Sequence, residues 1–521
     1  MLFNKKRKSN CGESTLNAGE NDNNRQNIRE PSNDMPLTSQ NLRKILDGNS
    51  DVVFMNFNIG GNATLPAYLL YVDGLSDSSL VGDFVLKPLV TEQRFLEAGN
   101  MRDVIRLIES GIIYFPSQII TNNIMKTVNA VMSGSCALVL DNCETAILFD
   151  TKGFDKRAIT EPTVENVTKG SKDSFVETLR TNTATVRRKI KTQNLCIEQT
   201  IVGKQTLTPI AIVYIKGLAN TGIIDELKRR LDSIDIDSAI VSGSIEEFVS
   251  DNVYSTFPQI LSTERPDKFC SEIVEGRVGI IIDGIPVAFI VPGTLVQFLQ
   301  APEDYSRSWM IGTIIRVLRF SVLILTAVLP AYYIGATSYH PELIPFRLAI
   351  AIAESSKDVA FPTFAETLFM LVSFEVLFEA SLRIPRSVGQ AITIVGTIVI
   401  GQSAVTAKLV SPVVVVVLAI TSTASFVMPN QDFSNAIRLW RFLLTVMGSL
   451  AGLFGLVVGM IILLWHLAKL ESFGVPYLSP LVSGEGMKQA EDTFFRLPLK
   501  FNKVRPANLK PRNKKRKGGG T

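Results

Sequence analysis

The 521-residue sequence contains few of the residues that catalytic and metal sites use most often. It has only two histidines, His340 and His466, both within or beside a long apolar region, which excludes most histidine-dependent catalysis. The five cysteines form no CxxC pair, so the sequence indicates neither a zinc site nor a disulfide framework, and a reducing compartment fits best. A G-x-x-x-x-G-K-S/T phosphate loop and an H-E-x-x-H zinc helix are also missing. We therefore expect no enzyme activity, no metal and no cofactor.

The start of the chain lacks the apolar run of a signal peptide. Residues 5–8 are basic, but an Asn-rich stretch follows them, so we expect no secretion signal. Residues 1–35 are rich in Asn, Ser, Glu and Arg and have no periodic apolar face, which predicts a disordered segment. The formal net charge of +4 is a near balance of the two signs, and we expect no nucleic-acid partner.

Apolar residues make up 46% of the chain, which is high for a soluble protein of this length, and they are unevenly spread. Up to about Arg307 charged residues are frequent, as in ordinary globular proteins. Beyond it, long apolar runs alternate with short polar connections. We therefore expect an integral membrane protein with a soluble α/β region followed by an all-α multi-spanning membrane domain.

Two pairs of similar passages occur in the soluble region. Residues 67–75 (AYLLYVDGL) resemble residues 210–218 (IAIVYIKGL), and residues 134–141 (GSCALVLD) resemble residues 276–283 (GRVGIIID). Each copy has an apolar strand, a helical pattern and a later hairpin-like strand pair. Nearly continuous apolar strands indicate a sheet that is covered on both faces. The pattern predicts two related α/β subdomains.

We place these subdomains at residues 36–150 and 194–311, the second including a linker, with a connecting helical segment at 151–193. The pair of subdomains could form a ligand-binding or partner-binding cleft, or a duplicated scaffold for assembly. A basic helix at residues 177–191 is interpreted first as a solvated face. A contact with anionic lipid or with another subunit is the alternative.

The membrane domain is expected at residues 312–470, with a basic cytoplasmic tail at 471–521. Five segments approach the roughly 20 apolar residues that a spanning helix needs. They cover about residues 316–337, 362–382, 388–407, 409–428 and 437–468. The basic tail and the unsignalled soluble region favour the cytoplasmic side, which requires an even number of crossings. We therefore expect four spanning helices, the last of them tilted, plus one acid-bearing amphipathic helix at 362–382.

Three carboxylates distinguish the segment at 362–382. Glu366, Glu375 and Glu379 are costly at bilayer depth and must face a protein interior, a water-filled path or the interface. They are the candidate pore or gating residues, since acidic side chains line many cation pathways. In the alternative, the helix lies at the interface and its acids pair with Arg383 and Arg386.

Four glycines in the last apolar segment favour close helix packing. Gly448, Gly452, Gly455 and Gly459 form two small-xxx-small pairs, a spacing that allows two backbones to approach each other. Whether this contact lies within one subunit or between subunits remains open at this point.

Several passages resemble the A subunits of the GerA-type spore germination receptors, in the same order along the chain. They are residues 263–267 (TERPD), 302–305 (PEDY), 329–333 (LPAYY), 340–345 (HPELIP), 374–380 (FEVLFEA) and 383–385 (RIP). The resemblance extends from about Leu37 to Ala468. It departs from the family pattern at residues 169–173 (KGSKD) and at Lys357 and Ala360.

The resemblance implies a nutrient (germinant) receptor component that is multi-pass in the inner membrane of a bacterial spore. Its partners are a transporter-like B subunit, which is the expected nutrient binder, a lipoprotein C subunit and membrane lipids. It also implies a homo-oligomer, a pentameric ring, that forms a nutrient-gated channel for monovalent cations. The amino-terminal region and the basic tail are expected on the cytoplasmic (core) side.

Three alternatives share some of these features. A sister spore-membrane ion channel of the same family, acting later in germination, would carry nearly the same motifs. A secondary transporter would place a substrate site at broken helices near the bilayer midplane. A structural scaffold would keep the acids ion-paired and conduct no ions.

Overall fold

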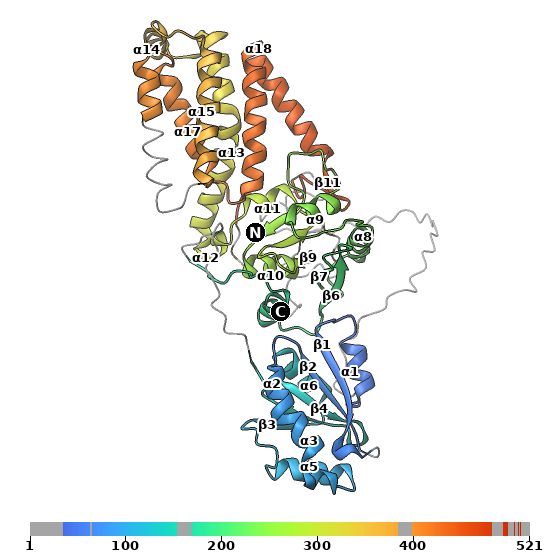
Figure 1. The fold of residues 1–521 in the computed structure, drawn as a ribbon. Coiled ribbons are helices and arrows are strands. Elements are labelled where there is room, and N and C mark those ends of the chain that lie inside the picture. Colours follow the sequence, from blue (N-terminus) through green and yellow to red (C-terminus); the bar gives the residue numbers. More distant parts are fainter. Residues whose placement is uncertain are drawn as a thin grey trace, which may run out of the picture.

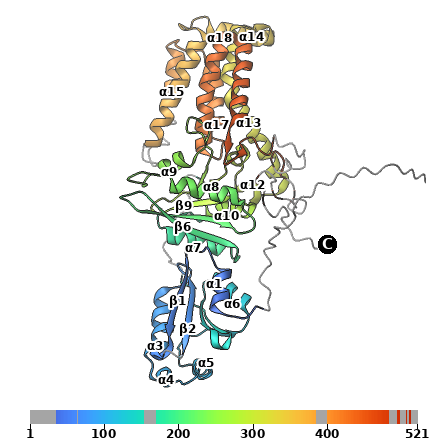
Figure 2. The same ribbon diagram turned by 90° about the vertical axis from the view of Figure 1, so that its right-hand side faces the viewer.

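The computed structural model describes residues 35–62, 65–153, 165, 169–383, 399–481, 493–496, 498, 505, 509 and 511, with the side chains of 381–383 excepted. The expected disordered segment therefore lies almost entirely outside the described residues, as does most of the basic tail. Two α/β subdomains follow each other along the molecule, and a helix bundle extends from the second one (Figures 1 and 2).

The first subdomain is a five-stranded sheet with helices on both faces. Its strand order is β1-β2-β4-β5-β3, and all neighbouring strands are antiparallel. The strands are β1 (Val52–Asn58), β2 (Pro66–Val72), β3 (Gln118–Thr121), β4 (Cys136–Leu140) and β5 (Thr145–Phe149). The helices are α1 (Ser39–Ile45), α2 (Ser78–Leu80), η2 (Val81–Leu86), α3 (Lys87–Thr91), α4 (Gln93–Leu96), α5 (Met101–Glu109) and α6 (Ile124–Met132).

Every residue of β4 is buried, because its alternate side chains enter two different cores. Leu138 packs toward η2, α3 and α5, whereas Ala137 and Val139 pack toward α1 and α6. This explains why the strand is a continuous apolar run in the sequence and not an alternating one.

The second subdomain repeats this topology strand by strand. Its order is β6-β7-β9-β10-β8, again with antiparallel neighbours. The strands are β6 (Leu195–Val202), β7 (Thr208–Ile215), β8 (Leu261–Thr263), β9 (Val278–Ile282) and β10 (Ala288–Val291). The helices are α7 (Leu179–Lys189), α8 (Thr221–Asp232), α9 (Ser242–Val249) and α10 (Pro266–Glu275). The predicted α/β region of two related subdomains is thereby confirmed.

Local sequence sets the position of α10 against this sheet. Pro266 stands at its first turn and Gly276, with φ 104°, ends it in the left-handed conformation. The helix packs so closely on β9 that a Cβ on Gly279 would lie 2.1 Å from the ring of Phe269. Only glycine allows this approach.

The basic helix α7 lies between the two sheets and buries one of its basic side chains, whereas Lys189 at its end is exposed. Arg187 is 1% exposed, and its Nε and Nη2 donate to the two carboxylate oxygens of Asp51 at 2.6 and 2.7 Å. Nη2 also donates to Oδ1 of Asn49 at 2.7 Å. The prediction of a solvated face is therefore wrong for Arg187, because Asp51, which directly precedes β1, covers it.

The bundle is built from long apolar helices. The elements are α11 (Leu295–Leu299), α12 (Glu303–Ser306), α13 (Trp309–Ser338), η4 (Pro341–Leu343), α14 (Phe346–Ser356), α15 (Thr363–Arg383), α17 (Pro412–Ser425) and α18 (Gln431–Lys469), followed by β11 (Glu471–Ser472) and β12 (Val475–Pro476). Residues 399–406 are helical as well. By length and composition, α13 and α18 could each cross a membrane.

The last apolar segment is a helical hairpin and not one tilted helix. The backbone of α18 leaves the helical region at Ala451 and Gly452, where Gly452 has φ 61° and ψ −142°. The second limb therefore runs back beside the first (Figure 1), and the rings of Trp440 and His466 lie 5.5 Å apart. The single crossing expected at 437–468 is replaced by two antiparallel limbs, because glycine can adopt this conformation.

The acid-bearing helix α15 is packed into the bundle through its first half. α15 shares an apolar core with α13 and α17 through Tyr333, Met370, Leu371 and Val414. The bundle therefore contains α15 as a member and α18 as two limbs, and the number of helices that cross a membrane stays a prediction.

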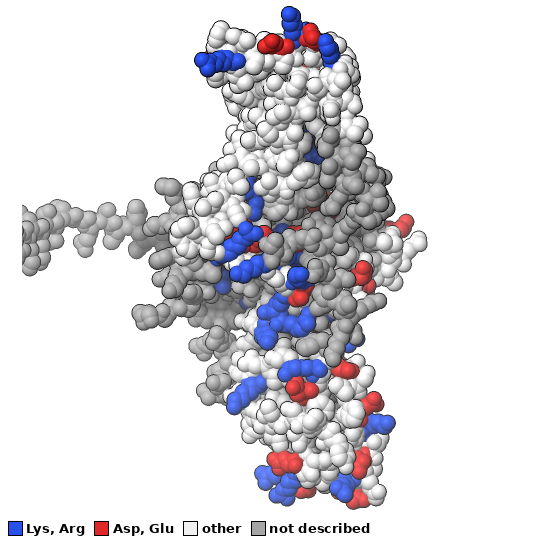
Figure 3. Space-filling view, turned by 90° about the vertical axis from the view of Figure 1, so that its left-hand side faces the viewer, with Lys and Arg blue, Asp and Glu red and all other residues white. Residues whose placement is uncertain are grey.

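Charged side chains are scarce on the visible face of the bundle. In Figure 3 the visible part of this face is almost uncharged between the far end of the bundle and the soluble subdomains. The charges of the bundle on this face gather at its far end (Figure 3). Asp358, just after α14, and Lys408, just before α17, pair at 2.8 Å. An uncharged band between two charged levels is the surface that a bilayer requires.

Candidate functional site

The acid-bearing helix α15 is packed firmly at one end only. Glu366, Thr367, Met370 and Leu371 are buried. Among residues 372–380 none is buried. In Figure 2, α15 stands at the edge of the bundle. Within the described part of the chain, the second half of α15 is therefore an edge element with no buried side chain up to residue 380.

Glu366 supports the neighbouring helix α17. It is 1% exposed, and its Oε2 accepts a hydrogen bond of 2.7 Å from the backbone N–H of Ser411, the N-cap residue of α17. A carboxylate in this place satisfies a free N–H and complements the positive end of the helix dipole. The contact joins the start of α15 to the start of α17.

Glu375 joins α15 to α18. Its carboxylate accepts hydrogen bonds from Nε and Nη2 of Arg438, the former at 3.3 Å, and lies 3.6 Å from Nη2 of Arg441. The Arg438 guanidinium also covers the ring of Phe378, 4.0 Å from its centroid. We call Glu375, Arg438 and Arg441 the charged cluster. It holds one negative and two positive charges.

Glu379 lies one turn further along α15, is exposed and takes part in a polar interaction. The side chain of Arg383 and the whole of Arg386 lie outside the described residues, so the expected pairing with them stays a prediction. The structure instead places Glu375 against two arginines of α18. Sequence reasoning missed these arginines, although their spacing of three puts them on one helical face.

A cavity of about 260 Å³ opens beside the charged cluster, between α15, α17 and α18. Its walls are mainly apolar, with Phe374, Leu377, Phe378 and Phe426 among them. Arg441 also lines it and is 2% exposed. Within the described part of the chain, Nε and Nη1 of Arg441 have no hydrogen-bond partner.

The four candidate packing glycines lie at helix contacts or at the turn. A Cβ on Gly448 would lie 3.0 Å from the carbonyl oxygen of Ala331 in α13. Gly452 makes the turn of the hairpin. Cβ atoms on Gly455 and Gly459 would meet Met447 and Leu444 of the opposite limb, at 2.0 and 2.7 Å. The three contacts and the turn all involve residues of the same chain.

A second buried charge cluster lies at the base of the bundle, between α12, α13 and the tail. Asp304 is 1% exposed and accepts hydrogen bonds of 2.9 and 3.1 Å from Arg319. Arg316 approaches the same carboxylate to 3.6 Å, and Arg496 donates to the Asp304 carbonyl at 2.6 Å. The passage 302–305 thereby fixes the first turns of α13.

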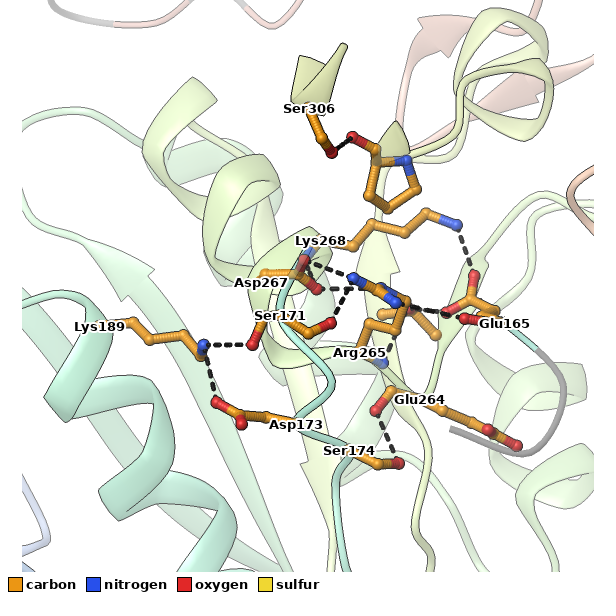
Figure 4. Close-up of polar contacts among 12 residues, drawn as sticks. Glu165, Ser171, Asp173, Ser174, Lys189, Glu264, Arg265, Asp267, Lys268 and Ser306 are labelled. Atoms are coloured by element: carbon orange, nitrogen blue, oxygen red, sulfur yellow. Dashed lines mark hydrogen bonds and ion pairs between the residues drawn. The ribbon is translucent and has the colours of Figure 1, made fainter. Parts of the chain in front are cut away.

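The passage at 263–267 holds the segment that precedes α7 (Figure 4). Arg265 is fully buried, and its Nη2 donates to Asp267 at 2.7 Å and to the carbonyl of Ser171 at 2.9 Å. Lys268 donates to Glu165 at 2.8 Å. Residues far apart in the sequence are thus held together beside the start of α10.

Comparison with known proteins identifies the family. Residues 40–508 match the family described as Bacillus/Clostridium GerA spore germination protein. The chain belongs to this family. The match covers both subdomains and the bundle, so the GerA family accounts for nearly the whole chain.

Individual relatives of this GerA-family chain agree with that assignment. It is 36% identical over 478 residues to spore germination protein B1 of Bacillus subtilis (strain 168), covering 92% of this chain and 98% of that protein. It is 37% identical over 490 residues to spore germination protein KA of the same organism, covering 93% and 88%. The GerA-family chain is therefore a spore germination receptor A subunit by family, and this is not a known enzyme family.

A solved structure is also similar to this chain. It is the crystal structure of the N-terminal domain of the A subunit of the Bacillus megaterium spore germinant receptor GerK3. The match has 30% sequence identity and a TM-score of 0.39, and covers 48% of this chain and 91% of that one.

Proposed function

We propose that this chain is the A subunit of a nutrient receptor whose helix bundle forms, as a homo-oligomeric ring, a nutrient-gated channel for monovalent cations. A transporter-like B subunit binds the nutrient, and a lipoprotein C subunit completes the receptor. The bundle crosses the inner membrane of the spore, and the soluble subdomains and the basic tail lie on the core side.

The path of the chain supports this orientation. The chain enters the bundle at α13 and leaves it by the second limb of α18, which ends beside the second subdomain. There, Ser472 donates to the carbonyl of Gln259 at 2.8 Å, and Leu295 donates to the carbonyl of Tyr477 at 2.9 Å. Both ends of the bundle therefore lie on the same side, as an even number of crossings requires.

The observation that carries the gating proposal is the uneven packing of α15. One half is buried against α13 and α17, and the other half is held to α18 by the charged cluster. Separating Glu375 from Arg438 lets this second half move while the first half stays fixed. Glu375 thus releases the moving half during gating, Glu366 anchors the fixed half to α17, and Glu379 attracts cations.

The strength of the contact between Glu375 and Arg438 determines how much free energy nutrient binding must supply to open the channel. Glu375 is 35% exposed, so its pair lies between the ~1 kcal/mol of surface ion pairs and the ~3–5 kcal/mol of buried ones. Nutrient binding must favour the open form by a comparable difference in affinity, since a ligand with equal affinity for both forms shifts nothing.

The test is potassium and sodium efflux from liposomes that contain the purified receptor, with and without nutrient. Glu375→Gln should raise the nutrient-independent flux, about tenfold for each 1.4 kcal/mol of lost contact energy. Glu379→Gln should lower the preference for cations over anions. Glu471→Gln, an exposed acid beyond α18, is the matched control and should change neither.

Replacing Glu366, Glu375 and Glu379 together by Gln distinguishes a channel from a scaffold. Unchanged flux and selectivity would remove these acids from the conduction mechanism. No flux from the wild-type receptor under any condition would refute the channel itself. Particle images of the purified protein test the ring, because a closed symmetric assembly is required.

A further inference from the structure

The loop between α9 and β8, residues 250–260, is a well-braced protrusion of the second subdomain. The side-chain amide of Gln259 closes its base, because it donates to the carbonyl of Asn252 at 2.7 Å and accepts from the N–H of Asn252 at 3.0 Å. The Asn252 side chain accepts a hydrogen bond of 3.1 Å from the N–H of Tyr254. Phe257 is 1% exposed and packs against four rings of the bundle and its following segment: Phe433, Trp440, His466 and Tyr477.

Two polar contacts place this loop along the side of α18. Thr256 accepts a hydrogen bond of 3.1 Å from the indole N–H of Trp440, in the first limb of α18. Ser255 Oγ lies 3.1 Å from Nε2 of His466, in the second limb. Trp440 is the tenth residue of α18. Since an α-helix rises 1.5 Å per residue and its side chains lean toward the N-terminus, the loop reaches roughly 10–14 Å up the helix.

The surface beside the loop is apolar at this height. Leu439 and Trp465, each next in the chain to one of these contacts, are 58% and 64% exposed, and Nζ of Lys469 lies 5.6 Å from the centroid of the Trp465 ring. The loop continues this surface, because Val253 is 53% exposed and Tyr254 is 98% exposed. Tryptophan, tyrosine and a lysine that extends toward water are typical of the interface between a bilayer and water.

The charges around the loop exclude attraction to anionic lipid as the cause of such a contact. In the described part of the chain, every charged residue that lines the cavity of about 470 Å³ beside the loop is acidic: Glu246, Glu247 and Asp432. Asp251, at the start of the loop, already pairs with Arg230. Affinity for a membrane must therefore come from the apolar side chains of Val253 and Tyr254.

We propose that Val253 and Tyr254 insert into the interfacial region of the bilayer and anchor the second subdomain to the membrane surface. The partner is a zwitterionic lipid interface, with the tyrosine ring among the upper acyl groups and its hydroxyl toward water. Interfacial segments bury apolar groups about 5–10 Å into the boundary between headgroups and acyl chains. The anchor rests on the proposed function only in requiring that the bundle crosses a membrane, and it is independent of conduction.

The experiment measures depth with a nitrobenzoxadiazole label on the full-length chain, reconstituted into phosphatidylcholine liposomes. Tyr254→Cys carries the label at an exposed position, so the substitution removes no buried contact. Tyr114→Cys, 88% exposed in the first subdomain, is the matched control. Ile461→Cys, at an exposed position of the second limb of α18, is the reference for the membrane. The described cysteines of the wild type are buried or half-buried, so labelled wild type gives the background.

The label at position 254 should emit at a shorter wavelength than the label at position 114. It should also lose more emission to a nitroxide near the lipid headgroup than to one near the end of the acyl chain. The label at position 461 should show the reverse order, and the label at position 114 should lose no emission. Adding phosphatidylglycerol should leave the quenching at position 254 unchanged, because the contact is apolar.

The reference position separates failure of the anchor from failure of the proposed function. Quenching at position 461 without quenching at position 254 overturns the anchor and leaves the crossing of the bundle intact. No quenching at either position refutes the crossing and the anchor together. A shorter emission wavelength at position 254 without lipid quenching places the loop against another subunit and overturns the lipid partner. Quenching at position 254 only with phosphatidylglycerol makes the contact electrostatic and overturns the apolar anchor.

Discussion

Replacing Arg187 by Gln is expected to weaken the junction between the two soluble subdomains severely. The guanidinium is 1% exposed and makes three short hydrogen bonds, two to Asp51 and one to Asn49. It also donates to the carbonyl of Leu195 at 3.2 Å. A glutamine side chain is shorter and uncharged, so it cannot replace these hydrogen bonds. The buried carboxylate of Asp51 is then left without a cationic partner.

The magnitude follows from the burial of both partners. Asp51 has a side chain only 5% exposed, so water cannot replace the lost arginine. Removing one member of such a pair costs about 3–5 kcal/mol. For the two soluble subdomains together, a loss of this free energy lowers the unfolding temperature by roughly 6–20 °C.

The assay is differential scanning calorimetry of the full-length chain in detergent, combined with hydrogen exchange of peptides from β1 and β6. Arg180→Gln is the matched control on the same helix. Arg180 pairs with Asp73 at 2.6 Å, but the two side chains are 49% and 41% exposed. Its loss should cost no more than about 1 kcal/mol.

A double variant separates the charge effect from packing. Asp51→Leu combined with Arg187→Met removes both charges, so it should be far more stable than Arg187→Gln alone. The reasoning would be refuted if Arg187→Gln lowered the unfolding temperature no more than Arg180→Gln does.

Three further predictions concern other contacts. Gly448→Val should destabilise the chain by about 1–3 kcal/mol in thermal unfolding, because its Cβ meets the Ala331 carbonyl at 3.0 Å; an unchanged unfolding temperature would contradict this. Glu366→Ala should cost about 1–3 kcal/mol, because the Ser411 N–H loses its acceptor, and full stability would show that another acceptor replaces it. Burial, together with the neighbouring charge of Asp432, raises the pKa of Glu246 from 4.5 to about 7. Between these two pH values the native state keeps a proton on Glu246 that the unfolded state releases. The free energy of unfolding should therefore fall as pH rises from about 4.5 to 7. Unfolding temperatures between pH 4.5 and 8 should show this fall in wild type and a smaller one in Glu246→Gln; equal slopes would exclude Glu246 as its source.

The duplicated fold could be predicted because its signal is local. Buried strands such as β4 and β9 are continuous apolar runs, and the passages at 67–75 and 210–218 become β2 and β7 with the same neighbours in each sheet. The apolar block after Arg307 was equally visible. The hairpin in α18 was not, because a glycine in an apolar run fits a close helix contact as well as a turn.

The partners of the charged residues could not be derived from the sequence. Charge spacing suggested that Glu379 pairs along its own helix with Arg383, which stays a prediction, but it gave no sign that Glu375 lies against Arg438 and Arg441, more than sixty residues away. The run at 177–191 suggested a solvated face, but Asp51 closes over Arg187. Helical periodicity shows which side chains share a face and contains no information on what packs against that face.

The sequence by itself determined two related sheets, an apolar helical region and membership in the GerA family. These follow from backbone preferences and from the removal of apolar surface from water, both of which act over a few neighbouring residues. The tertiary structure decided that Gly452 turns the chain, that Glu366 accepts a hydrogen bond from the start of α17, and that Glu375 lies against Arg438 and Arg441. Such outcomes depend on burial, which only contacts between distant segments create, and burial determines whether a charge is solvated, paired or available to a ligand.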